Sequence, residues 1–371
     1  MVARVRPSPP WRDLSPGRVD RRRGASFARQ VEWGVTSRYA GAMKSVQLGK
    51  SGLKVSNVCL GTMTFAREAD RAESFRIMDA YAEAGGFFLD TANGYSAGAT
   101  EETVGAWIRE RGNRSSIVLA TKVYSSMGPG PNDGGLSRYH IMNEVDQSLR
   151  RLQTDVIDLY QIHRWHPQTP VDETARALDD LVRAGKVRYI GCSNLRGYQL
   201  LLFLQRQRST LCESFVSVQP PYNALNRAIE LEVLPVVERE GLAVIPYNPL
   251  AAGMLTGKYR RNAELPKGAR MQAHEFYNRR YYTDEALEIA ERFVAHAREL
   301  GMTPAQLALA WVLADPRITA PIVGARSVEQ LTDSLCALDR ELSPDERAAV
   351  PAITTGRWVG EDPVYDATAY R

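Results

Sequence analysis

The sequence has few of the residues that bind structural metal ions. Its 371 residues include four cysteines and five histidines. The cysteines stand far apart and form no Cys-x-x-Cys pair; they are Cys59, Cys192, Cys212 and Cys336. This spacing offers no zinc-ligand motif. We therefore expect no metal site, and free thiols in a reducing, cytoplasmic compartment.

The sequence also lacks long hydrophobic runs, and it lacks an excess of positive charge outside its first 43 residues. No apolar run approaches the length of a membrane-spanning helix. The formal net charge is +4, but residues 1–43 carry nine arginines against three acidic residues, so this segment is +6 and the rest is about −2. Neither a nucleic acid nor a membrane is therefore the partner that we expect.

Residues 1–43 differ in composition from the rest of the chain. They are rich in arginine, proline, serine and glycine and have few grouped hydrophobic residues, which predicts a disordered extension. Three interpretations stay open: translation that begins at Met43, a free tail, or a targeting peptide. We expect one folded domain over residues 44–371.

Regular patterns begin after Met43. A hairpin is predicted over residues 45–55. Beyond it, short apolar segments alternate with amphipathic segments of helical length. The predicted strands are 58–60, 87–89, 117–120, 156–160, 187–191, 216–219, 243–247 and 319–323, and the predicted helices are 71–84, 101–110, 139–151, 172–184, 196–206, 228–240, 284–300 and 303–314.

Eight strands joined by helices predict an α/β fold, a (β/α)8 TIM barrel with an N-terminal β-hairpin. The alternative is a doubly wound open sheet, which would need Gly-x-Gly-x-x-Gly after the first strand. The sequence has Gly61-Thr62-Met63-Thr64-Phe65-Ala66 there. Two long connections, 124–138 and 249–283, follow strands, so in a barrel they lie at its C-terminal, catalytic face.

Four polar residues stand at or just after the ends of consecutive predicted strands. Asp90 and Tyr95 follow the second strand, Lys122 the third and His163 the fourth. In a barrel these side chains converge on one pocket. A lysine charge beside a tyrosine favours its ionised form and so eases proton donation. Asp90 would orient Lys122, and His163 could donate a hydrogen bond to a carbonyl oxygen.

Each of these residues also has an ordinary structural explanation, namely packing for the tyrosine and the histidine and solvation for the lysine. Together they resemble a known pattern. The segments Asp90–Tyr95, Thr121–Lys122, Gln161–His163 and Gly191–Asn194 look like signatures of the aldo-keto reductase superfamily. Together with Pro246–Lys258, the resemblance is strongest to the bacterial-type and potassium-channel β-subunit-like branch. It extends from about residue 44 to about residue 342.

The resemblance implies that Asp90, Tyr95, Lys122 and His163 are catalytic and that NADPH/NADP⁺ lies across the barrel mouth. It also implies a set of cofactor-binding residues around the nicotinamide, the pyrophosphate and the adenosine. These are Gly61, Thr62, Met63, Asp90, Ser193, Asn194, Gln219, Tyr247, Asn248, Leu250, Gly253, Leu255, Gly257, Lys258, Gly324, Arg326, Gln330 and Ser334.

Arg326 decides the expected cofactor preference. It follows the last strand and precedes a predicted helix, where backbone N–H groups favour an anion. An arginine can bind a phosphate through two hydrogen bonds. By resemblance this position recognises the adenosine 2′-phosphate, so NADPH is preferred over NADH. Ser334 stands where the family often has asparagine, which predicts a weaker hold on the adenine.

The substrate is the least defined part. Tyr95 and His163 would contact it, and Tyr124 and Trp165 could form an aromatic wall suited to an aryl aldehyde, although a small aliphatic one also fits. No second arginine or lysine cluster indicates a phosphorylated or carboxylated substrate; Arg164 is an exception that the sequence leaves open.

We expect reduction of a small carbonyl substrate to an alcohol. Alcohol oxidation in the reverse direction, and a cofactor-binding regulatory or sensor subunit with little turnover, stay open. A Schiff-base lyase that uses Lys122 is disfavoured, because such a lysine must lose its charge and Asp90 would preserve it. The natural substrate and the oligomeric state are not defined by the sequence.

Overall fold

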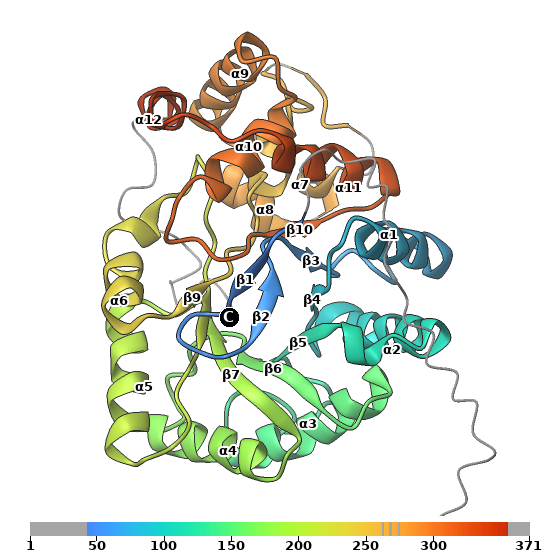
Figure 1. The fold of residues 1–371 in the computed structure, drawn as a ribbon, viewed down its shortest axis with the longest axis vertical. Coiled ribbons are helices and arrows are strands. Elements are labelled where there is room, and N and C mark those ends of the chain that lie inside the picture. The colour runs from blue at the N-terminus through green and yellow to red at the C-terminus, as the bar shows by residue number, and fades with distance from the viewer. Residues whose placement is uncertain (1–42, 262, 267–268, 274, 355–371) are drawn as a thin grey trace, which may run out of the picture. The chain divides into compact units, whose positions relative to one another are not determined.

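The computed structural model describes residues 43–354, apart from 262, 267–268 and 274. Apart from Met43, the predicted N-terminal extension lies outside the described residues. Eight parallel strands form one sheet in the order β10-β3-β4-β5-β6-β7-β8-β9 (Figure 1). The strands are β3 (Cys59–Gly61), β4 (Phe88–Asp90), β5 (Val118–Val123), β6 (Ile157–Ile162), β7 (Val187–Ser193), β8 (Ser217–Gln219), β9 (Ala243–Val244) and β10 (Ile322–Gly324).

The first and last positions of this order are also joined. Val244 accepts a hydrogen bond from the N–H of Thr319 at 2.9 Å, and Pro246 accepts one from the N–H of Ile322 at 2.8 Å. Tyr247 and Ile322 form a parallel bridge. The strands therefore curl into a barrel, which confirms the predicted (β/α)8 architecture over the open sheet.

The hairpin is confirmed as β1 (Ser45–Gln47) paired antiparallel with β2 (Lys54–Ser56). Leu48 and Val55 are fully buried in one cluster with inward-facing barrel residues such as Phe88. The N–H of Lys50 donates to Gly241 at 3.0 Å, just before β9 begins. The hairpin thus covers the end of the barrel where the strands begin (Figure 1), opposite the end that carries the predicted site.

Helices alternate with the strands as predicted, and the long connection before residue 284 contains two further helices that the sequence pattern did not indicate. None of the described helices has both the length and the apolar character needed to cross a bilayer. The helices are α1 (Arg71–Glu83), α2 (Ala99–Arg111), α3 (Arg138–Leu152), α4 (Val171–Arg183), α5 (Gly197–Ser209), α6 (Val233–Glu240), α7 (Arg270–Ala273), α8 (Glu275–Tyr281), α9 (Asp284–Glu299), α10 (Pro304–Leu313), α11 (Val328–Leu335) and α12 (Pro344–Ile353).

Alternation along the strands brings the polar residues into the barrel. Phe88 and Ala120 face its interior, so Asp90 and Lys122, two residues further on, face the same way. Thr121 faces outward instead: its hydroxyl donates to Glu101 of α2 at 2.5 Å, and Glu101 also accepts from Arg151 of α3 at 2.7 Å. This buried network ties β5 to its covering helices beside Lys122.

Candidate active site

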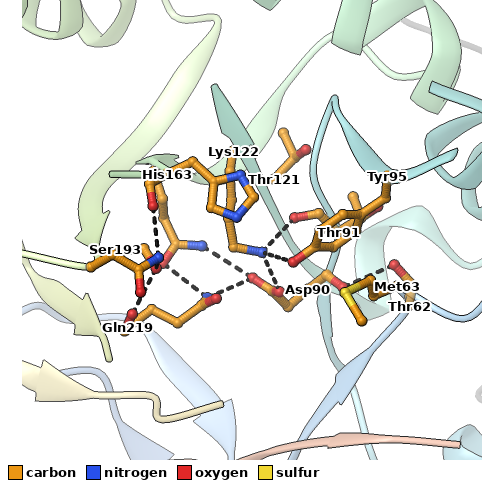
Figure 2. Close-up of polar contacts among 12 residues, drawn as sticks. Thr62, Met63, Asp90, Thr91, Tyr95, Thr121, Lys122, His163, Ser193 and Gln219 are labelled. Atoms are coloured by element: carbon orange, nitrogen blue, oxygen red, sulfur yellow. Dashed lines mark hydrogen bonds and ion pairs between the residues drawn. The ribbon is translucent and has the colours of Figure 1, made fainter. Parts of the chain in front are cut away.

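Asp90, Lys122 and Tyr95 are in direct contact at the C-terminal end of the barrel (Figure 2). The ammonium of Lys122 donates to Asp90 Oδ2 at 2.5 Å, to the carbonyl of Thr91 at 2.9 Å and to the Tyr95 hydroxyl at 3.1 Å. Tyr95 begins a short 3₁₀ helix, Tyr95–Gly98, that follows β4. The turn after the strand therefore returns the phenol to the lysine.

The other carboxylate oxygen of Asp90 is held by two amides. Gln219 of β8 donates to Asp90 Oδ1 at 2.8 Å and Gln161 of β6 donates to it at 3.1 Å. All three side chains are almost fully buried. A buried carboxylate must be paired and hydrogen-bonded, and here Lys122 and the two amides meet that need, so the Asp90–Lys122 pair is fixed in position.

Burial and charge act in opposite directions on the two reactive groups. Burial alone would lower the pKa of Lys122, but Asp90 and Tyr95 together raise it above its ordinary value, so the lysine stays charged. Burial raises the pKa of Tyr95, and the Lys122 charge opposes this rise without cancelling it. Tyr95 is therefore protonated at neutral pH, next to a permanent positive charge that can stabilise its anion.

His163 lies beside Tyr95. The two rings meet edge to face with centroids 5.8 Å apart. Burial, with the positive charges of Lys122 and Arg164, lowers the pKa of His163 well below its ordinary value. The imidazole is therefore neutral at physiological pH, so it can donate one N–H hydrogen bond but cannot serve as a cationic acid.

A cavity of about 660 Å³ opens beside these residues. This volume is in the range of small-molecule sites. Sixteen of the predicted cofactor-binding residues line it, as do Tyr95 and His163. These sixteen are Gly61, Thr62, Met63, Asp90, Ser193, Asn194, Gln219, Tyr247, Asn248, Leu250, Gly253, Lys258, Gly324, Arg326, Gln330 and Ser334.

The residues predicted to hold the nicotinamide are hydrogen-bonded to one another. Asn194, which has a left-handed φ of 56°, donates to the carbonyl of His163 at 2.9 Å and accepts from the Tyr247 hydroxyl at 2.9 Å. Ser193 donates to the carbonyl of Gln219 at 2.6 Å. This network links β6, β7 and β8 to the segment after β9 and sets the side chains in fixed positions.

The segment predicted to surround the pyrophosphate has an unusual backbone. Ala251 and Ala252 have φ of 49° and 55°, and Gly253 has 89°. Left-handed alanines are strained and persist where the surroundings hold them. Asn248 does so here: its side chain accepts from the N–H of Ala252 at 2.6 Å and donates to the Tyr281 hydroxyl at 2.9 Å.

Arg326 also lines the cavity and stands just before α11. Ser327 caps that helix, and Gln330 accepts a hydrogen bond from the N–H of Arg326 at 3.1 Å. A dinucleotide fits the donors present. An aromatic ring and amides line the cavity together with Asp90 and Tyr95, as does a strained glycine-containing loop with Lys258. A guanidinium lies at a helix start, which suits an anion.

Besides the fully buried Lys122, which reaches the cavity wall through its contact with Tyr95, four predicted residues are not among the lining residues of this cavity. Leu255 is fully buried in the hydrophobic core, and Gly257 packs against Val294. Tyr124 packs edge to face on His166 at 5.7 Å, and Trp165 packs likewise on Phe203 at 5.9 Å. The two aromatic residues follow β5 and β6, but their rings pack against neighbouring rings.

Several lining or supporting residues were not predicted. Gln161 shares the inward face of β6 with Leu159, so strand alternation alone could have indicated it. Ser125 stands next to the predicted Tyr124 in the sequence and lines the cavity. Arg164, which the sequence left open as a possible contact for an anionic substrate, lines it too. Tyr277 of α8 also lines it, and its hydroxyl donates to the sulfur of Met63 at 4.0 Å; no sequence signal indicated this residue.

Comparison with known proteins agrees with this geometry. The aldo/keto reductase family model matches residues 57–354. The chain belongs to the aldo/keto reductase family. It is 42% identical over 313 residues to a Bacillus subtilis protein named "uncharacterized oxidoreductase YrpG", a match that covers 82% of this chain and 93% of the relative.

Other relatives include a protein of Arabidopsis thaliana named "probable voltage-gated potassium channel subunit beta". It is 37% identical, over 80% of this chain and 92% of its own length. Protein tas of Escherichia coli is 34% identical, over 84% of this chain and 97% of its own length. The chain is therefore an oxidoreductase of a family that generally uses NADP(H) to reduce carbonyl groups. The charged state of Lys122 also argues against Schiff-base chemistry.

Proposed function

We propose that this chain reduces an aldehyde or ketone to an alcohol with NADPH and that Tyr95 donates the proton. The observation that carries the proposal is the contact of the Tyr95 hydroxyl with Lys122, which is itself paired with Asp90, at the wall of a dinucleotide-sized cavity. NADPH, when bound, supplies the hydride.

The roles of the protein side chains follow from their charges. Tyr95 is protonated before reaction and gives its proton to the carbonyl oxygen as the carbonyl carbon is reduced. Lys122 then stabilises the tyrosinate, and solvent returns the proton. Asp90 keeps Lys122 charged and oriented. The neutral His163 donates a hydrogen bond that directs the carbonyl oxygen toward Tyr95. The same groups permit alcohol oxidation in the reverse direction.

The direct test is oxidation of NADPH by the full-length protein with para-nitrobenzaldehyde and a panel of aliphatic aldehydes and ketones. Turnover with formation of the alcohol supports the proposal. Similarity to the channel subunit relative favours a second candidate, a cofactor-binding regulatory subunit. Binding of NADPH without turnover on any carbonyl would replace the first proposal with the second.

Arg326→Ala is expected to weaken NADPH selectively. Charge-assisted hydrogen bonds contribute about 1.5–3 kcal/mol, so the Kd for NADPH should rise by a factor of about 10 to 150, while the Kd for NADH, which has no 2′-phosphate, should change little. Fluorescence titration measures both. Arg298→Ala, on the exposed face of α9, is the matched control. Equal losses for both cofactors would show that Arg326 does not recognise the 2′-phosphate.

The pH dependence of reduction is expected to be flat. His163 has a lowered pKa and Tyr95 a raised one, so both keep one protonation state from about pH 6.5 to about pH 9.5. Since kcat/KM reports the free protein, its value for a neutral aldehyde should be constant across this range. A fall centred near the ordinary histidine pKa would contradict the neutral state of His163.

A further inference from the structure

Gln161 contacts both the catalytic ion pair and a predicted cofactor-binding residue. Its side chain is fully buried on the inward face of β6. The amide nitrogen donates to Asp90 Oδ1 at 3.1 Å, and the amide oxygen accepts from Gln219 Nε2 at 3.3 Å. Asp90 is paired with Lys122, and Gln219 belongs to the predicted cofactor site. Gln161 therefore joins the two parts of the site inside the barrel.

A glycine on the strand between them lets the two glutamines meet. Gln161 lies on β6 and Gln219 on β8, so β7 runs between them. Gly191 of β7 pairs in register with Gln161, and it follows Tyr189 by two residues on the inward face. A Cβ on this glycine would lie 3.3 Å from Gln161 Cγ and 2.6 Å from the Ser217 hydroxyl oxygen. The missing side chain thus leaves room for Gln161 to reach across β7.

These contacts fix the direction in which the Gln219 amide points (Figure 2). The carboxylate of Asp90, paired with the charged Lys122, only accepts hydrogen bonds, so the nitrogens of both glutamines face it. Gln219 Nε2 donates to Asp90 Oδ1 at 2.8 Å and also to the Gln161 oxygen. An amide nitrogen has two N–H groups, and both are used here. Because Gln219 lines the cavity, its amide oxygen is the group that it presents to a ligand.

An amide oxygen in this place selects a ligand with an N–H donor. The carboxamide of nicotinamide has a nitrogen with two N–H groups, so it can donate to this oxygen. Without Gln161, the second N–H of Gln219 would lose its acceptor, and a buried donor without a partner is unfavourable. The Gln219 amide would then be held by Asp90 alone and would be free to rotate about that contact.

We propose that Gln161 is a positioning residue for the cofactor: it fixes the Gln219 amide so that the oxygen accepts a hydrogen bond from the nicotinamide carboxamide. The inference rests on the proposed function, because it requires a nicotinamide in this cavity. Gln161 acts through its neighbours, since it is not among the described residues that line the cavity. Its contact with Asp90 also ties nicotinamide recognition to the carboxylate that holds Lys122.

The test compares the binding of NADP⁺ with that of its 3-acetylpyridine analogue, in which a methyl group replaces the carboxamide nitrogen. Isothermal titration calorimetry of the full-length protein gives both Kd values. The analogue leaves a buried acceptor unpaired, so the unmodified protein should bind it more weakly by a factor of about 5 to 150. Gln161→Met keeps the length of the side chain and removes the amide, so it should lower this ratio by a factor of about 3 or more.

Three further variants separate positioning from general damage. Gln219→Met removes the amide itself and should make the two Kd values nearly equal. Gln161→Glu keeps an oxygen that accepts from Gln219, so it should retain most of the ratio. Gln207→Met is the matched control, because Gln207 of α5 is also fully buried and accepts from the N–H of Phe215 at 3.2 Å. This last variant should leave the ratio unchanged.

Three results would overturn the proposal. Equal Kd values for the two ligands in the unmodified protein would show that Gln219 does not bind the carboxamide, while the proposed reduction would still stand. An undiminished ratio in Gln161→Met, or an equal fall in Gln207→Met, would show that Gln161 does not position Gln219. If neither ligand binds to the unmodified protein, the proposed function fails and this inference fails with it.

Gln161→Asn replaces Gln161→Met if the latter does not fold. It keeps a polar side chain whose amide is one methylene too short to reach Gln219, so the ratio should fall in the same way. An undiminished ratio in this variant would contradict the proposal equally.

Discussion

Tyr95→Phe is expected to abolish nearly all carbonyl reduction while leaving cofactor binding intact. The substitution removes one hydroxyl, which contacts Lys122 at 3.1 Å, and keeps the ring that packs on His163. General acid catalysis contributes a factor of about 10² to 10⁴, so kcat should fall by that factor. The Kd for NADPH, measured by fluorescence titration, should stay the same.

Tyr277→Phe is the matched control, because it removes a second tyrosine hydroxyl from the wall of the same cavity. Its hydroxyl contacts the Met63 sulfur and not the lysine, so we expect kcat to change by less than about tenfold. If kcat falls by a similar factor in both variants, the loss comes from removing any hydroxyl from the cavity and not from removing a proton donor that contacts Lys122. Full activity in Tyr95→Phe would exclude Tyr95 as the proton donor.

Lys122→Met is expected to damage both activity and folding. Lys122 is fully buried and Asp90 nearly so. Removal of the lysine leaves the carboxylate with the amides of Gln161 and Gln219 and no counter-ion. Removing one partner of a buried ion pair costs about 3–5 kcal/mol. Chemical denaturation should show a free energy of unfolding lower by this amount, and reduction should be lost.

The double variant Asp90→Asn with Lys122→Met separates the two losses. It replaces the carboxylate of Asp90, which has lost its counter-ion, with a neutral amide of the same shape. The double variant should therefore recover much of the free energy of unfolding lost in Lys122→Met. It should stay inactive, because no charge is left to stabilise the tyrosinate. If the double variant is as unstable as the single one, the cost comes from cavity formation and not from the unpaired charge of Asp90.

The contacts among the proposed catalytic residues could be predicted because these residues stand at strand ends. Asp90, Lys122 and Gln219 face the barrel interior by simple alternation, and parallel strands deliver their ends to one face. Their mutual contacts follow from the topology, so local patterns that indicate each strand also indicate which polar residues meet. The same alternation predicts that Gln161 also faces the barrel interior. The sequence analysis named only His163, the residue that follows this strand.

The segment predicted to surround the pyrophosphate and the part of the cavity wall formed by Tyr277 were harder to predict. The left-handed φ of Ala251 and Ala252 depends on Asn248 and Tyr281, because alanine alone disfavours this conformation. Leu255 belongs to a motif, yet burial in the core decides its position. Tyr277 reaches the cavity only because the long connection folds into α8, and no apolar period in the sequence indicates that helix.

The central claim is that this chain transfers hydride from NADPH to a carbonyl carbon with Tyr95 as the acid. The most direct measurement is a single turnover with NADPH that carries deuterium at its transferable position, with the product alcohol analysed by mass spectrometry. We predict deuterium on the carbinol carbon with the unmodified protein, and far less at the same reaction time with Tyr95→Phe. Bound cofactor with no deuterium in any alcohol would contradict the account and leave a cofactor-binding subunit without this chemistry.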